Sequence, residues 1–353
     1  MKYFLILLPA WAYQIEYSTT AVPLENWMSY FADIYVADLP MIPGSHDSGT
    51  QAVLPTEDWL GIAGWLYAQT QTLSIRDQLD AGIRLLDIRV WIAYDLFDQY
   101  NSIYVSHTFR STYTLTAALD EVAEFLIANP TEFVYLNLRI DAAHPLTEDI
   151  TEQKEYLESM VLSSAITLGE VVGADLLNLK VKDVAGKVLL ICPPGKVLPT
   201  DTQILYLASP AEYDLCDIFQ DSSQYLAKET ISECFPSTPV SPRLTGQITG
   251  FALDGQFDQV WPAITSPEMN EWFIYNFQSN PDWEARTKYP IGVFLFDFVD
   301  TEYTAILVQY IMNFGYPYPY LGEKPEWTMG MAITTKSVEN IYLPIIFFII
   351  NML

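Results

Sequence analysis

Two of the three histidines in this chain stand where side chains could transfer protons. His46 lies in the stretch "MIPGSHDSGT", directly before Asp47, and His107 lies near the end of the run "SIYVSHTF". Histidine has an ordinary pKa close to neutral pH, so it can both accept and donate a proton in a reaction. Two histidines with a neighbouring carboxylate therefore predict chemistry in which one group loses a proton and another gains one.

Further charged residues lie inside runs that are otherwise apolar. Asp87 and Arg89 are in "IRLLDIRVW", Arg139 and Asp141 are in "EFVYLNLRID", and Asp297 is in "IGVFLFDFVD". Each residue alone fits a structural ion pair. Because unpaired charge is costly to bury, charges that end several separate runs favour one shared site. Arg89 could stabilise an anionic group, because its guanidinium is a planar fork of donors.

The elements that carry these residues are predicted to be parallel strands joined by helices. Side chains alternate between strand faces, so Asp87 with Arg89, and Arg139 with Asp141, lie opposite the aliphatic residues. Helical patterns such as "TLTAALDEVAEFLIANP" separate several runs. This alternation predicts an α/β fold of the (β/α)₈ TIM-barrel type, whose chemistry lies at the C-terminal ends of the strands. The strand-like runs are "DLPMIPG", "IRLLDIRVW", "SIYVSHTF", "EFVYLNLRI", "GKVLLICPP" and "IGVFLFDFVD".

The composition excludes some partners. The chain has 44 acidic and 17 basic residues, a formal net charge of -27 and a pI of about 4.2. We expect no nucleic-acid partner, because a phosphate backbone requires a basic surface. Attraction to an anionic membrane is also disfavoured, so any membrane contact would be apolar. We expect a monomer.

The remaining candidates for metal or redox chemistry are few. The cysteines, Cys192, Cys216 and Cys234, match no metal-ligand spacing, and we expect no metal and no cofactor. In an exported protein Cys216 and Cys234 would form the disulfide, and Cys192 reads as a core thiol. His144, the third histidine, has no assigned role and is expected to lie in a loop.

The two ends of the chain are apolar. Residues 1–12, "MKYFLILLPAWA", resemble a short signal peptide, and residues 341–353, "IYLPIIFFIINML", loosely fit a lipid-anchor attachment signal. Both could equally be apolar segments packed on the protein. The expectation is one domain over residues 20–325 in a secreted or extracellular protein, lipid-anchored at its C-terminus; the alternative is a cytoplasmic location.

These residues, in this order, resemble the X domain of phosphatidylinositol-specific phospholipase C. The resemblance rests on "NWMSYFADIYVADLPMIPGSHDSGT", "GWLYAQTQTLSIRDQLDAGIRLLDIRVW", "YVSHTF", "NPTEFVYLNLR" and "GVFLFDFVD". It covers most of the chain between about residues 26 and 300 and is densest in the first half. The fold that it implies is a distorted (β/α)₈ barrel, in agreement with the strand pattern.

The resemblance also implies roles for the charged residues. His46 matches the general base that deprotonates the inositol 2-hydroxyl, and Asp297 matches the carboxylate that orients this base. His107 matches the general acid that protonates the leaving diacylglycerol. Asp47 and Asp87 match carboxylates that hold the acid histidine and the arginine in place.

Arg89 implies the metal-independent, bacterial-type branch of the family, because the calcium-dependent branch carries a carboxylate there. Arg139 and Asp141 match a basic and an acidic residue that contact the inositol ring. Pro193 departs from the family pattern, since the bacterial enzymes carry another ring-binding arginine at this point. The headgroup therefore stays open.

A short segment between the first two strands, "TEDWLGIAGWLYAQ", resembles a helix that bacterial members insert into the membrane interface. The candidate membrane contacts are Trp59, Leu60, Trp65 and Leu66, and the alternative is that these residues cap the barrel.

The predicted function is cleavage of phosphatidylinositol or glycosyl-phosphatidylinositol by attack of the 2-hydroxyl, with a phospholipid substrate at a membrane interface. The alternatives are a catalytically idle phosphoinositide-binding module, a related phosphodiesterase for another headgroup, and a metal-dependent phosphodiesterase. Arg89 disfavours the last of these, because it would lie where a cation would bind.

Overall fold

The computed structural model of the protein describes part of the chain. The described residues are 14–17, 23–39, 41–52, 68–94, 100–107, 109–141, 151–167, 179–191, 228–229, 232, 244–248, 262–279, 293–314 and 331–334. Several sequence predictions fall outside them: the two apolar ends, all three cysteines, His144 and the proposed membrane-contact residues Trp59, Leu60, Trp65 and Leu66. These stay predictions.

The chain divides into two compact units, Met1–Ala21 with Pro325–Leu353, and Val22–Lys324. The described part of the first unit is an antiparallel pair, β1 (Gln14–Tyr17) with β10 (Met331–Thr334). All other described elements belong to the second unit. None of the described helices is both long and apolar enough to cross a membrane.

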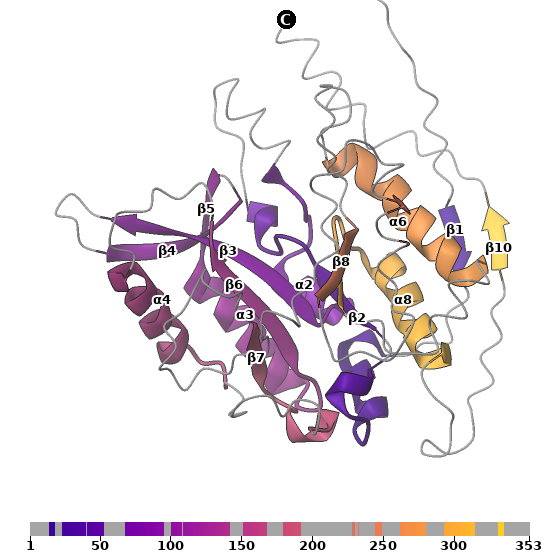
Figure 1. Ribbon diagram of the computed structural model, residues 1–353, viewed down its shortest axis with the longest axis horizontal. Coiled ribbons are helices and arrows are strands. Elements are labelled where there is room, and N and C mark those ends of the chain that lie inside the picture. Colours follow the sequence, from indigo (N-terminus) through magenta and orange to yellow (C-terminus); the bar gives the residue numbers. More distant parts are fainter. Residues whose placement is uncertain are drawn as a thin grey trace, which may run out of the picture. The chain divides into compact units, whose positions relative to one another are not determined.

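The second unit contains one mixed sheet and the helices that cover it (Figure 1). Its strands are β2 (Ile42–Ser45), β3 (Leu85–Tyr94), β4 (Tyr100–His107), β5 (Phe109–Thr114), β6 (Val134–Ile140), β7 (Val188–Ile191), β8 (Leu244–Ile248) and β9 (Val293–Phe296). Its α-helices are α2 (Ile75–Asp80), α3 (Leu115–Ala128), α4 (Thr151–Ser163), α6 (Pro262–Ser279) and α8 (Thr301–Phe314). Short 3-10 helices are η1 (Leu24–Phe31), η2 (Val36–Asp38), η3 (Thr50–Ala52) and η5 (Val181–Asp183).

The parallel strands follow the order of a barrel. Going round the sheet, β2, β3, β6 and β7 are successive neighbours, and β8 pairs with β9, which pairs back to β2. The pairing of the first of these strands with the last is what a closed (β/α)₈ barrel requires. Among the described residues the sheet stays open between β7 and β8. The predicted α/β barrel class is confirmed, in a distorted and partly open form.

The strand that carries His107 runs against the expected direction. The sequence pattern predicted parallel strands throughout, but β4 is antiparallel to both β3 and β5. Residues 92–101 between the two predicted runs are too few for the crossover that a parallel return needs, which takes a dozen or more residues. The chain instead continues β3 to Tyr94 and turns back along it.

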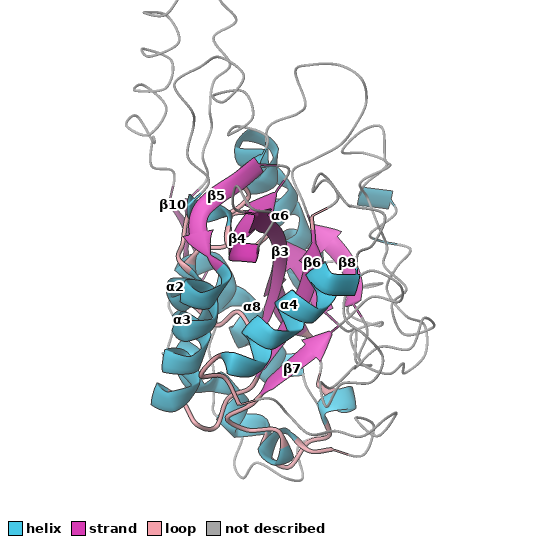
Figure 2. Cartoon of the chain, turned by 90° about the vertical axis from the view of Figure 1, so that its left-hand side faces the viewer, coloured by secondary structure: helices cyan, strands magenta, loops and turns pink. Residues whose placement is uncertain are grey.

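The helices form where caps and apolar faces coincide. The Thr114 hydroxyl accepts a hydrogen bond from Ala117 N at the start of α3, and the helix buries Leu119, Val122 and Phe125 on one face. α2 begins in the same way at Ser74 and packs against α3 (Figure 2). These two helices cover one side of the sheet near its longest strand, β3.

A buried ion pair just before β3 links this strand to η1 and to the segment before β6. Arg84 and Glu132 are both fully buried and lie 2.8 Å apart between Nη2 and Oε2. The same guanidinium donates to the carbonyl oxygens of Leu24 and Glu25 in η1, and its plane lies over the Phe125 ring. This pair is satisfied within the protein on all sides, so it is structural.

Candidate active site

The first two groups of the site meet because β2 and β9 are neighbours. Ser45 pairs with Phe296 in the parallel register, so the next residues, His46 and Asp297, leave the sheet side by side. His46 Nδ1 lies 2.8 Å from Asp297 Oδ1, although the residues are 251 positions apart in the chain. His46 is 7% exposed and Asp297 is fully buried. A buried carboxylate on Nδ1 holds the proton there and leaves Nε2 for chemistry.

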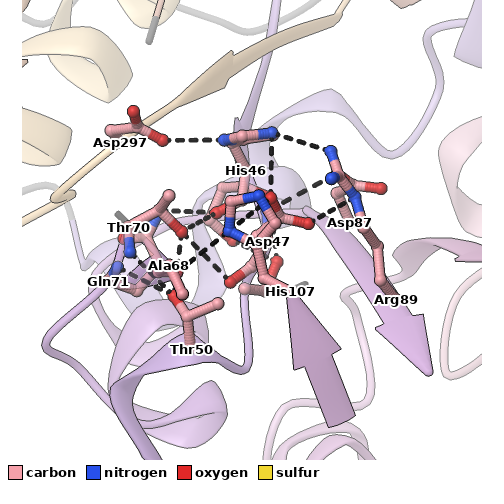
Figure 3. A network of polar contacts seen from close by, with 12 residues as sticks. His46, Asp47, Thr50, Ala68, Thr70, Gln71, Asp87, Arg89, His107 and Asp297 are labelled. Atoms are coloured by element: carbon pink, nitrogen blue, oxygen red, sulfur yellow. Dashed lines mark hydrogen bonds and ion pairs between the residues drawn. The ribbon is translucent and has the colours of Figure 1, made fainter. Parts of the chain in front are cut away.

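Asp47 follows in a tight turn and contacts one guanidinium and two imidazoles. Its φ of +43° lies in the left-handed region, which aspartate tolerates better than most residues. Oδ1 lies 2.6 Å from Arg89 Nε, and Oδ2 lies 3.1 Å from His46 Nε2 and 3.2 Å from His107 Nδ1. Neither carboxylate oxygen receives a well-aligned hydrogen bond, so the contacts are electrostatic, and an imidazole adds a full charge only when it is protonated. Figure 3 shows Asp47 between the two rings and the guanidinium.

His46 Nε2 has two neighbours of opposite charge. Arg89 Nη2 lies 3.0 Å from it, and Asp47 Oδ2 lies 3.1 Å from it. Arg89 can only donate, so the neutral ring accepts from Arg89 with its proton on Nδ1 toward Asp297, whereas the protonated ring faces Asp47. His46 Nε2 therefore has a partner in both protonation states, Asp47 when it carries a proton and Arg89 when it does not.

His107 reaches the same carboxylate from β4. Its Nδ1 lies 2.9 Å from the carbonyl oxygen of Ala68, which fixes a proton on this nitrogen. The side chain is 18% exposed, more than that of His46, and the two ring centroids are 5.9 Å apart. This spacing leaves the two imidazoles close enough to serve one small reacting group.

Asp87 does not support Arg89 as the resemblance implied. In the described part of the chain the ion pair of Arg89 is with Asp47, while Asp87 pairs with Arg139, 2.9 Å between Oδ2 and Nη2. Asn137 Nδ2 donates to the other oxygen of Asp87 at 2.7 Å. The register explains the exchange, because Asp87 lies opposite Asn137 in the β3–β6 ladder. The single carboxylate of Asp47 contacts both Arg89 and His107.

Arg139 and Asp141, the predicted headgroup contacts, are both engaged inside the protein. Arg139 pairs with Asp87, and Asp141 accepts a hydrogen bond from Ser106 Oγ at 3.1 Å. Asp141 is 3% exposed, and its backbone N donates to Val90 O beyond the end of β6. Their contact with a substrate stays a prediction.

The charges shift the two histidine pKa values in opposite directions. Burial disfavours the protonated form of His46, but the charges of Asp47 and Asp297 and the bond to Asp297 outweigh it and raise the pKa of this ring. Burial lowers the pKa of His107, with Arg89 and His46 acting in the same direction against Asp47. Burial of Asp47 is outweighed by Arg89 and both histidines, which hold its pKa well below the usual range. When the two histidines together hold one proton in the free protein, that proton therefore lies on His46 rather than His107.

Three side chains of the site have the atoms to ligate a metal ion, but Arg89 already supplies a positive charge beside them. His46, Asp47 and Asp87 each offer an atom within 4.8 Å of the others. The Arg89 guanidinium lies directly on Asp47, where a cation would have to approach. We therefore assign no metal to these residues.

Sequence reasoning missed a polar layer beneath the histidines. Thr70 and Gln71 donate to the carbonyl oxygen of His46 through their side chains. Ala68 contacts the His107 ring through its carbonyl oxygen, and Thr50 bonds to Thr70 (Figure 3). Thr70 and Gln71 lie in a loop and Thr50 begins the three-residue helix η3, and in such short segments no strand or helix period marks a buried face. Asn137 could have been found, because it shares a strand face with Arg139.

Residues 62–192 match the family model described as phosphatidylinositol-specific phospholipase C, X domain. The resemblance read from the sequence is confirmed over this segment. Asp87, Arg89 and His107 lie within it, whereas His46, Asp47 and Asp297 lie outside it and join the X-domain residues only through the fold.

Curated relatives match over similar lengths. The 1-phosphatidylinositol phosphodiesterase of Listeria monocytogenes is 33% identical over 123 residues, which are 34% of this chain and 34% of that protein. PI-PLC X domain-containing protein 1 of Homo sapiens is 30% identical over 152 residues, 36% of this chain and 45% of that protein. The matches thus span less than half of each relative.

Solved structures extend the likeness of the fold beyond the X-domain segment. The phosphatidylinositol-specific phospholipase C of Listeria monocytogenes superposes with a TM-score of 0.60 at 20% identity, covering 82% of this chain and 99% of that one. A mutant of the enzyme from Staphylococcus aureus gives 0.57 at 18% identity, covering 81% and 98%. At these identities the likeness shows the barrel fold alone.

Proposed function

We propose that the protein is a phosphodiesterase that cleaves phosphatidylinositol or a glycosyl-phosphatidylinositol by internal attack. The observation that carries this proposal is the convergence of a carboxylate-bound imidazole, a second imidazole and a guanidinium around Asp47. The X-domain match over residues 62–192 and the names of the relatives point to the same substrate class.

In this reaction His46 Nε2 takes the proton of the inositol 2-hydroxyl, and the oxygen then attacks the neighbouring phosphorus. The bond from phosphorus to the diacylglycerol oxygen breaks as His107 gives that oxygen a proton. The products are diacylglycerol and a cyclic inositol phosphate. Arg89, whose Nη2 lies 3.0 Å from Nε2 of the base His46, stabilises the charge on the phosphoryl oxygens.

A related phosphodiesterase with another headgroup is the second candidate. Arg139 and Asp141, the headgroup contacts predicted from the sequence, are bound to Asp87 and Ser106 within the protein. If they keep these partners with substrate present, other residues select the headgroup. The acid-base chemistry at phosphorus would be the same.

Phosphorus NMR of the products tests the proposal. Phosphatidylinositol vesicles treated with the protein in excess EDTA should yield a cyclic inositol phosphate, and the His46→Ala variant should yield none. Turnover of a different phosphodiester, but not of phosphatidylinositol, would favour the second candidate. Loss of turnover in EDTA that calcium restores would contradict the role of Arg89, and vesicle binding without any product would indicate an idle module.

The roles of the two histidines can be separated by the leaving group. A diacylglycerol alkoxide needs a proton to depart, whereas nitrophenolate departs without one. With an inositol phosphodiester of nitrophenol, His107→Ala should recover much of the activity that it loses on the lipid, on the order of 10²- to 10⁴-fold. His46→Ala should not recover, because the 2-hydroxyl must still lose its proton. Rescue of the His46 variant instead would reverse the two roles.

A further inference from the structure

A buried loop before α2 binds the residues on both sides of the His46–Asp297 pair. Gln71 is fully buried, and its Nε2 donates to the carbonyl oxygens of His46 at 3.0 Å and Phe296 at 2.8 Å. Its Oε1 accepts from Val299 N at 3.1 Å. One amide therefore uses both of its N–H groups and its oxygen on the ends of β2 and β9.

The partners of Gln71 lie next to the two catalytic groups in the chain. Phe296 directly precedes Asp297, Val299 follows it by two positions, and the third partner is His46 itself. His46 N also donates to Phe296 O at 3.0 Å, so the two strand ends are linked directly and through the amide. A change in this link would move the imidazole relative to its carboxylate.

Neighbouring residues hold the amide in place. Gln71 N and Thr70 N both donate to Thr50 Oγ1 at 3.0 Å, and Thr70 Oγ1 lies 3.0 Å from His46 O. Thr50 and Thr70 are both buried. The loop is thus fixed by its own hydrogen bonds before the side chain reaches the strand ends (Figure 3).

We propose that Gln71 is a positioning residue that sets the geometry of the His46–Asp297 pair. The catalytic consequence rests on the proposed function, but the effect on the pair does not. Gln71 acts through backbone atoms of the two strand ends and touches neither the imidazole nor the carboxylate. It resembles the outer groups that orient ligands and bases in other sites, whose loss leaves the chemistry present but misplaced.

Another buried glutamine provides a matched comparison. Gln78 in α2 is also fully buried, and its Nε2 also donates to two carbonyl oxygens, those of Ser48 and Leu73. Its bonds reach neither β9 nor His46, and its Oε1 has no hydrogen-bond partner among the described atoms. Gln71→Met removes three amide hydrogen bonds and Gln78→Met removes two, but only the first variant removes the link between β2 and β9.

The first test is an NMR titration of the full chain, which has three histidine signals to assign by His→Ala variants. Asp47, Asp297, Arg89 and His107 face the His46 ring. Loosening the bond to Asp297 should shift the His46 pKa downward, toward the ordinary value of about 6.5. Gln71→Met should give this shift and Gln78→Met should not. An unchanged His46 pKa in Gln71→Met, or equal shifts in both variants, would overturn the proposal.

Gln71→Asn covers the case in which the methionine variant does not fold. It keeps the amide but shortens the side chain by one methylene, so it cannot reach both strand ends, and the same shift is expected. A normal His46 titration in this variant would count against the proposal as well.

The second test measures turnover of phosphatidylinositol in a double-mutant cycle. Gln71→Met should lower kcat on the order of 10²-fold with little change in KM, as expected for a misplaced base. In the Asp297→Asn background the same substitution should cost much less, whereas additive losses would contradict action through the pair. Absence of wild-type activity would refute the proposed function, and the titration would still decide the role of Gln71.

Discussion

At the residue scale, the proton of the site lies on the wrong ring for the proposed reaction. The pKa of His46 is raised and that of His107 is lowered, so a pair that shares one proton keeps it on His46. The proposed roles require a neutral His46 and a protonated His107. The productive form is therefore a minor arrangement of the singly protonated pair, and the two rings titrate together.

This arrangement predicts which limb of the pH profile depends on Asp297. The higher pKa of the pair belongs mainly to His46, so it sets the alkaline limb of kcat/KM. Asp297→Asn removes a charge and a bond that raise this pKa, and the alkaline limb should move to lower pH while the acidic limb stays. Steady-state rates over the pH range on phosphatidylinositol would measure both limbs.

Asp300→Asn is the matched control for this profile. Asp300 lies three residues later, is exposed and accepts a hydrogen bond from Tyr303 N at the start of α8. Its substitution should leave both limbs in place. Movement of the acidic limb in Asp297→Asn would instead mean that His46 holds the lower pKa of the pair.

At the element scale, the strand faces were predictable and the direction of one strand was not. Period-two alternation placed Asp87 with Arg89 on one face, and the β3–β6 register brings Asp87 against Asn137 as that pattern implies. His107 was expected at the C-terminal end of a parallel strand. It reaches the same level because β4 folds back along β3, with Val105 opposite Val90.

Edge sharing explains how β4 carries His107 to Asp47. β6 and β2 both pair with Leu85 and Leu86, so they occupy opposite edges of β3. β4 and β6 both pair with Val90, so β4 must take the edge that β2 leaves. His107, at the end of β4, therefore lies against the turn that follows β2, which contains Asp47. Neither this hairpin nor the layer around Gln71 carries a local signal, because both depend on contacts between distant segments.

The contact between this turn and β4 gives an element-scale prediction. A Cβ on Gly49 would overlap with Val105 Cγ1, so Gly49→Ala should displace the end of β4 and cost roughly 1–3 kcal/mol of unfolding free energy. Val105→Ala removes the overlapping methyl group, and the double variant should be more stable than the sum of the two single changes. Equilibrium urea denaturation measures the coupling.

Gly44→Ala provides the control for this cycle. A Cβ on Gly44 would crowd Leu295 and Leu85 rather than Val105, so its effect should add to that of Val105→Ala. Additive changes in unfolding free energy for the Gly49 and Val105 substitutions would show that the turn and β4 are not energetically coupled.

At the scale of the whole molecule, the fold gathers groups from both ends of the compact unit Val22–Lys324. β2 and β9 are neighbours only because the strand order returns on itself, and His46 and Asp297 meet at that junction. The order was predictable as a class from the alternation of strands and helices. The strand pattern did not predict that the sheet of the described residues is open between β7 and β8. β8 itself was not predicted, because the run "LTGQI" is short and contains a glycine.

The net charge of the whole molecule predicts how it meets a lipid surface. A formal charge of -27 repels anionic vesicles, and salt screens this repulsion over a Debye length of about 10 Å at 0.1 M. Binding to phosphatidylinositol vesicles should therefore strengthen as salt rises through this range. The His46→Ala variant prevents turnover during co-sedimentation, and zwitterionic vesicles, which carry no net charge, should show little dependence on salt. Binding that weakens with salt would instead reveal a local basic surface that binds the lipid phosphate groups although the net charge of the protein is negative.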